Sequence, residues 1–188
     1  SFRLLLKCSA ALLLIWLAAC GTGNPSGGGH DPNLPFPVTV SDSVTQTVTA
    51  TSGAIITTPD GLAMLEVPAN ALKQNAIFNV QAYVPSQVPG VVAGKLFVFY
   101  PQDLSAVLYS GTTLKVTLWY DPASLPSGYP ASDLRLGLYD TGRLCWKTVF
   151  LDSPAVSVTG AALSPVSSQS IAGLGVFGIV LFGTKTCS

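Results

Sequence analysis

The stretch FNVQAYV, residues 78–84, decides the fold class of this chain. Its apolar side chains fall at every second position, which is the period of a β-strand with one buried face. We therefore expect an antiparallel strand with Phe78, Val80, Ala82 and Val84 toward the core and Asn79, Gln81 and Tyr83 on the opposite face.

The same period of two recurs further along the chain. Leu114, Val116 and Leu118 alternate with polar side chains in residues 113–118, and three leucines do so in residues 134–139. Shorter apolar runs of similar composition occupy residues 44–50, 54–57, 63–67, 96–100, 144–150, 156–159 and 176–182. Turn-forming residues separate them, as in TPDG at 58–61, where Pro presets one backbone angle and Gly accepts a positive φ. About nine or ten strands at a spacing of roughly ten residues predict an all-β domain, either a sandwich or a barrel.

Several of these segments resemble ZU5 domains. SGAII at 52–56 and PDGLAMLEVPANAL at 59–72 resemble the opening of that family, with a glycine-led strand, a Pro-Asp-Gly turn and a Pro-x-x-Ala-Leu corner. Residues 99–104, 114–121 and 134–140 and then Trp146 follow in the family's order. The resemblance covers about residues 44–182 and implies an antiparallel β-sandwich that mediates protein contacts. A generic immunoglobulin-like sandwich is the alternative.

The first twenty residues have the layout of a secretory signal. Arg3 and Lys7 precede an apolar run at 10–17, and Leu-Ala-Ala-Cys follows at 17–20. These four residues resemble the lipobox of bacterial lipoproteins, which implies cleavage between Ala19 and Cys20 and lipid attachment at Cys20. Residues 1–19 are then a helical signal peptide. The alternatives are an ordinary cleaved signal or a transmembrane anchor, for which the run is short.

The lipid would retain the protein at a membrane, because two or three acyl chains bind a bilayer far more firmly than one. Gly21 rather than Asp follows Cys20, which in such lipoproteins implies the outer membrane where the cell has one. The chain opens with Ser1, so we do not take Arg3 and Lys7 as the whole of the charged segment.

Residues 20–37 are expected to form a disordered linker. The sequence GTGNPSGGGHDPNLPFP at 21–37 has no apolar periodicity and cannot bury enough surface to order itself. As a flexible coil it would span about 23 Å on average. His30, the only histidine, lies in this linker. The folded domain is therefore predicted at 38–188.

Cys145 and Cys187 are the two cysteines left once Cys8 leaves with the signal and Cys20 carries the lipid. In an exported protein we expect them to form a disulfide, which would close a loop of about 43 residues. Two unpaired thiols are the alternative.

Composition and motifs exclude several function classes. Nine basic residues balance nine acidic ones, and removal of Arg3 and Lys7 leaves seven against nine, so nucleic acid is not an expected partner. Residues 173–178 spell G-x-G-x-x-G, but no helix and second strand can follow, so we expect a strand rather than a dinucleotide site. The domain has no His for a catalytic triad or a zinc site. We expect no enzyme, no cofactor and no metal.

The leading hypothesis is a non-catalytic cell-envelope lipoprotein, held at the membrane by its lipid, whose sandwich contacts an unidentified protein. One alternative is a polysaccharide-binding module with Trp119 and Tyr120 as an aromatic platform, extended by Tyr129 and Tyr139. A second is a calcium-binding module that uses aspartates at strand ends, although these more often cap turns. The aspartates concerned are Asp60, Asp103, Asp121, Asp133, Asp140 and Asp152. A carboxylate-dependent hydrolase is a third, with Glu66 as the only glutamate.

Overall fold

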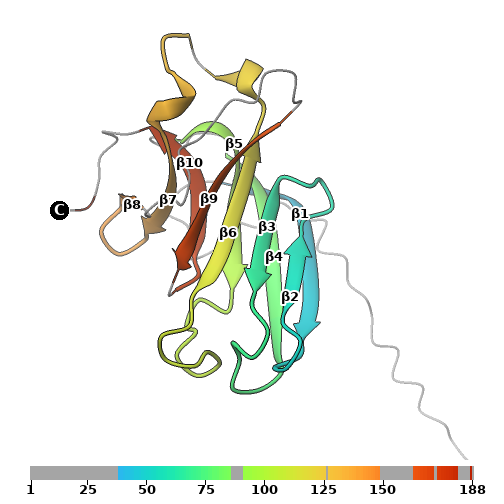
Figure 1. Ribbon diagram of the computed structural model, residues 1–188. Coiled ribbons are helices and arrows are strands. Elements are labelled where there is room, and N and C mark those ends of the chain that lie inside the picture. The colour runs from blue at the N-terminus through green and yellow to red at the C-terminus, as the bar shows by residue number, and fades with distance from the viewer. Residues whose placement is uncertain are drawn as a thin grey trace, which may run out of the picture.

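A computed structural model describes residues 38–85, 91–125, 127–148, 163–171, 173–181 and 187. They form two antiparallel β-sheets, as predicted (Figure 1). The six-stranded sheet has the order β1 (Val38–Val48), β4 (Ala76–Pro85), β5 (Val91–Tyr100), β10 (Val176–Leu181), β7 (Leu134–Asp140) and β8 (Cys145–Thr148). The four-stranded sheet has the order β2 (Ala54–Thr57), β3 (Ala63–Val67), β6 (Leu114–Tyr120) and β9 (Ser164–Ile171). Two short 3₁₀ turns, Pro122–Ser124 and Ala131–Asp133, lie between β6 and β7.

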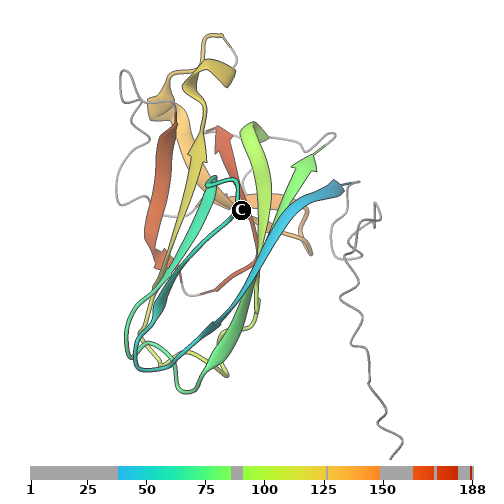
Figure 2. The same ribbon diagram turned by 90° about the vertical axis from the view of Figure 1, so that its right-hand side faces the viewer.

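The two sheets pack face to face as separate layers (Figure 2). Alternating apolar residues explain this arrangement, because β3 buries Ala63, Leu65 and Val67 while Met64 and Glu66 lie on its other face. β6 likewise buries Leu114, Val116 and Leu118. The predicted all-β sandwich is therefore confirmed as a fold class.

A second apolar cluster lies on the outer face of the six-stranded sheet. Trp146 of β8 lies over two glycines, Gly137 of β7 and Gly178 of β10, which are direct partners in the sheet. A Cβ atom added at Gly137 would lie 2.7 Å from Trp146 Cε3, and one at Gly178 would lie 3.1 Å from Cη2. The two glycines thus leave the room that the indole fills. The other buried members of this cluster are Tyr83, Leu96, Val98, Val176 and Val180.

This outer cluster corrects one prediction about residues 78–84. Phe78, Val80 and Ala82 face the core as expected, but Val84 is 50% exposed and Tyr83 is 2% exposed. Tyr83 is buried because it packs in the outer cluster, where its hydroxyl donates to Gln81 Oε1 at 2.5 Å. Tyr83 is thus buried on the face that the alternating pattern assigned to solvent.

Strand boundaries also differ from the prediction. β1 begins at Val38 and β5 at Val91, each several residues earlier than the apolar runs indicated. β9, with the sequence SPVSSQSI, was not predicted, since serine and proline are poor strand signals. The strand predicted at 156–159 lies outside the described residues. The G-x-G-x-x-G stretch leads into β10, as expected.

Gly53 is required by a close backbone approach. Its φ is +64°, and a Cβ atom at this position would lie 2.3 Å from the carbonyl oxygen of Val67. The turn from β1 to β2 can therefore press against the end of β3 only with glycine at this position.

Asp60 stabilises the turn from β2 to β3. This turn lies at the end of β2 opposite Gly53. Its carboxylate accepts hydrogen bonds from the Thr58 hydroxyl and the Leu62 amide, and Lys95 Nζ lies 2.8 Å from Oδ2. Burial raises the pKa of Asp60, but the bonds from Lys95, Thr58 and Leu62 lower it more, so the pKa lies below its ordinary value of 3.8.

We expect Asp60→Asn to lower the free energy of unfolding by about 1 kcal/mol at pH 7. A depressed carboxyl pKa stabilises the fold above the unfolded-state value of 3.8, and this contribution is lost as the pH falls through the lower folded-state value. The difference between variant and parent should therefore vanish in acid. Urea unfolding measured over a pH series checks this.

Asp42→Asn is the matched control, because Asp42 lies on β1 and its Oδ1 accepts from the Ser43 amide. A difference for Asp60→Asn that stays constant with pH would contradict the role of the charge.

Candidate functional site

The sequence-predicted lipidation and cleavage residues, Ala19 and Cys20, lie outside the described residues. Among the described residues, no helix is both long enough and apolar enough to cross a membrane.

The predicted aromatic platform is not brought together. Tyr120 is 1% exposed and belongs to the core between the sheets, whereas Trp119 is half-buried on the outer face of the four-stranded sheet. Neighbouring residues of a strand point to opposite faces, so these two rings cannot form one surface. This corrects the pairing of Trp119 with Tyr120 as a platform.

The predicted disulfide is confirmed. Cys145, the first residue of β8, bonds to Cys187, and the two Cα atoms lie 5.4 Å apart. The Cys187 amide also donates to the Trp146 carbonyl at 3.0 Å. The residue Cys187 is thus held against the outer edge of β8, next to the indole that covers the sheet.

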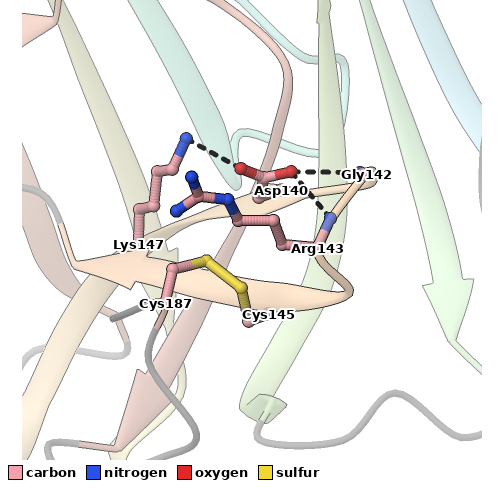
Figure 3. The surroundings of a disulfide bond; sticks show 6 residues. All are labelled: Asp140, Gly142, Arg143, Cys145, Lys147 and Cys187. Atoms are coloured by element: carbon pink, nitrogen blue, oxygen red, sulfur yellow. Dashed lines mark hydrogen bonds and ion pairs between the residues drawn. A yellow bond between two sulfur atoms is a disulfide. The ribbon is translucent and has the colours of Figure 1, made fainter.

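Asp140 orders the hairpin beside this disulfide (Figure 3). Its Oδ1 accepts from the amides of Gly142 and Arg143 at 3.0 Å, and its Oδ2 lies 2.8 Å from Lys147 Nζ. The bond from Lys147, followed by that from the Arg143 amide, lowers the pKa of Asp140 below its ordinary value. These bonds join the two ends of the hairpin turn to one carboxylate.

Four of the six aspartates that were considered as calcium ligands accept hydrogen bonds within turns. Asp60 and Asp140 have the partners given above, Asp103 accepts from the Ser105 amide, and Asp121 accepts from the Ala123 amide. Within the described residues, no group of three or more His, Cys, Asp or Glu side chains is placed to hold a metal ion. Asp152 lies outside those residues.

β1 is a long edge strand. It spans Val38–Val48 and pairs with β4 on one side, with a register shift at Ser41. In the described part of the chain, no backbone hydrogen bond reaches its other side, whereas β8 at the opposite edge receives Cys187. The strand contains one charged residue, Asp42, and neither Lys nor Pro. Natural edges are commonly blocked by Lys, Pro, a β-bulge or a covering segment, so β1 beyond its register shift is a more open edge than β8.

A shallow depression of about 400 Å³ lies where the loop from β5 to β6 meets the segment before β4. Backbone bonds join the two segments: the Lys73 amide donates to the Val107 carbonyl at 2.8 Å, and the Tyr109 amide donates to the Ala71 carbonyl at 3.0 Å. Leu104 and Leu108 are buried beneath them. The floor of the depression is therefore fixed by the fold.

Ser105 positions two opposite charges at this depression. Its carbonyl accepts from Lys73 Nζ at 2.8 Å, and its amide donates to Asp103 Oδ1 at 2.9 Å. The hydroxyl and amide of Ser105, in that order, hold the pKa of Asp103 below its ordinary value. The sequence reasoning missed this site, because Lys73 and Asp103 are 30 residues apart and nothing in their local sequence pairs them.

The comparisons with known proteins identify no family for this chain. No protein-family model matches it, and a search of curated proteins finds no significant relative.

Proposed function

We propose that this chain is a non-catalytic lipoprotein of the bacterial cell envelope whose ZU5-like sandwich binds another protein through the open edge of β1. The observation that carries the contact is β1 itself, an 11-residue strand that pairs on one side only within the described residues. An extended segment of a partner could add to it by backbone hydrogen bonds, as in other cases of strand addition.

The proposed lipid anchor supports this arrangement. The Leu-Ala-Ala-Cys sequence at 17–20 carries the lipid at Cys20 in the proposal, and residues 21–37 lead directly into β1. The open edge would then lie close to the tether, at the membrane. The outer-membrane location that Gly21 implies is part of the same proposal. Partners that share the membrane would meet β1 first.

The experiment uses the full chain, expressed in bacteria with a start methionine and analysed in the membrane fraction. A photoreactive phenylalanine derivative replaces Ser43 on β1 or, as the matched control, Ser132 between β6 and β7; both serines are exposed. We expect a discrete protein adduct from position 43 only. The intact mass of the same sample should show a chain that begins at Cys20 and carries a lipid.

A Thr39→Lys and Thr47→Lys pair provides the specificity control, because both threonines are exposed on β1 and lysines on an edge strand oppose strand addition. These substitutions should remove the adduct without lowering the melting temperature. Equal adducts from positions 43 and 132, or an adduct that survives the lysine pair, would overturn the edge contact. An unlipidated chain that retains residues 1–19 would overturn the anchor.

A further inference from the structure

We infer that the depression between Lys73, Asp103 and Tyr109 binds a neutral sugar unit of a polysaccharide. This site is separate from β1 and does not depend on the proposed lipid anchor. Its volume, about 400 Å³, is within the range of about 300–1,000 Å³ that is typical of small-molecule sites.

An aromatic ring is available at the rim. Tyr109 is 53% exposed, although its backbone amide is bonded to Ala71 and its neighbour Leu108 is buried. The ring therefore projects from a fixed backbone and can offer its face to the apolar C–H side of a pyranose ring.

The polar groups suit hydroxyls rather than ions. The ammonium of Lys73 donates and the carboxylate of Asp103 accepts, and Ser105 orients both. An anionic ligand would meet Asp103 and a cationic one would meet Lys73, so the pair favours a ligand without net charge. Ser110 and Thr112 add hydroxyl groups to the lining.

The depression lies at one end of the sandwich. Val38, the start of β1, pairs with Pro85, whereas Val48, at the other end of β1, pairs with Ala76, close to Lys73. β5 also ends at this second end of the sandwich, where the loop that carries Tyr109 begins. Val38, where the described residues begin, thus lies at the end of the sandwich opposite the depression.

Calorimetric titration of the full, detergent-solubilised protein tests the inference. The probes are maltohexaose, cellohexaose and the hexamer of N-acetylglucosamine, with inorganic phosphate as the ionic comparison. We expect at least one oligosaccharide to bind, and Tyr109→Ala to weaken it by about tenfold through loss of stacking.

Tyr129→Ala is the matched control, because Tyr129 is 47% exposed and lies between β6 and β7 at the opposite end of the sandwich. It should leave the affinity unchanged. Lys73→Met, which keeps the length of the side chain, should weaken the same oligosaccharide. Near-ultraviolet circular dichroism verifies that each variant is folded.

The inference is overturned if none of the three oligosaccharides binds, or if Tyr109→Ala binds as tightly as the parent. Equal losses for Tyr109→Ala and Tyr129→Ala would also overturn it. Phosphate that binds and displaces the oligosaccharide would identify an anion site instead. Binding at this depression has no bearing on the adducts expected from β1, so the two proposals fail separately.

Discussion

Replacing Trp146 with alanine is expected to lower the free energy of unfolding by about 3–5 kcal/mol. The indole is 2% exposed and lies over Gly137 and Gly178, which carry no side chain that could fill the space it leaves. Its ring also meets Tyr139 edge-on, with ring centres 5.0 Å apart. Since small domains are stable by only about 5–15 kcal/mol, this one change would remove a large share of the total.

Trp119→Ala is the matched control for this prediction. It makes the same chemical change at a half-buried position on the outer face of the other sheet. We expect a loss of about 1 kcal/mol there. Guanidinium unfolding of both variants, followed by far-ultraviolet circular dichroism, makes the comparison. A cost for Trp146→Ala no greater than that for Trp119→Ala would show that the outer cluster contributes little.

Loss of the disulfide is expected to lower the free energy of unfolding by about 3–4 kcal/mol. The bond joins residues 42 positions apart and so restricts the unfolded chain over a long loop. In the folded protein it also holds Cys187 against β8, where the Cys187 amide bonds to Trp146. For a domain of this size we expect the melting temperature to fall by about 10 °C.

The double variant Cys145→Ser and Cys187→Ser tests this without a free thiol at either position. Its melting temperature should match that of the parent in reductant, and reductant should not lower it further. If reduction leaves the melting temperature of the parent unchanged, the stabilising role of the bond is refuted.

Local patterns predicted the strands that alternate regularly. The period of two was enough to predict the strand with Leu114, Val116 and Leu118. The disulfide was predicted because Cys145 and Cys187 were the two cysteines left after the signal and the lipid site were assigned. The burial of Tyr83 could not be predicted, because it depends on the cluster with Trp146, more than 60 residues away. β9 was missed because pairing with β6, not the composition of its own residues, makes it a strand.

The candidate sites depend even more on long-range packing. No local sequence pattern marked Tyr109 as a site residue, because its surroundings come from two separate segments, around residues 71–73 and 101–112. Trp119 and Tyr120 were considered as a possible platform because they are adjacent in sequence, but neighbouring residues of a strand place their side chains on opposite faces. Residues next to each other in sequence were separated, and residues distant in sequence were brought together.

The central position of β10 has a consequence for the order of folding. β1, β4 and β5 form one part of the six-stranded sheet and β7 and β8 another, and β10 is the strand between β5 and β7. A nascent chain emerges N-terminus first, so these two parts have no strand to join them until residues 176–181 have been made. The six-stranded sheet therefore closes only after synthesis of nearly all the described residues, and a chain that ends before β10 cannot join its two parts.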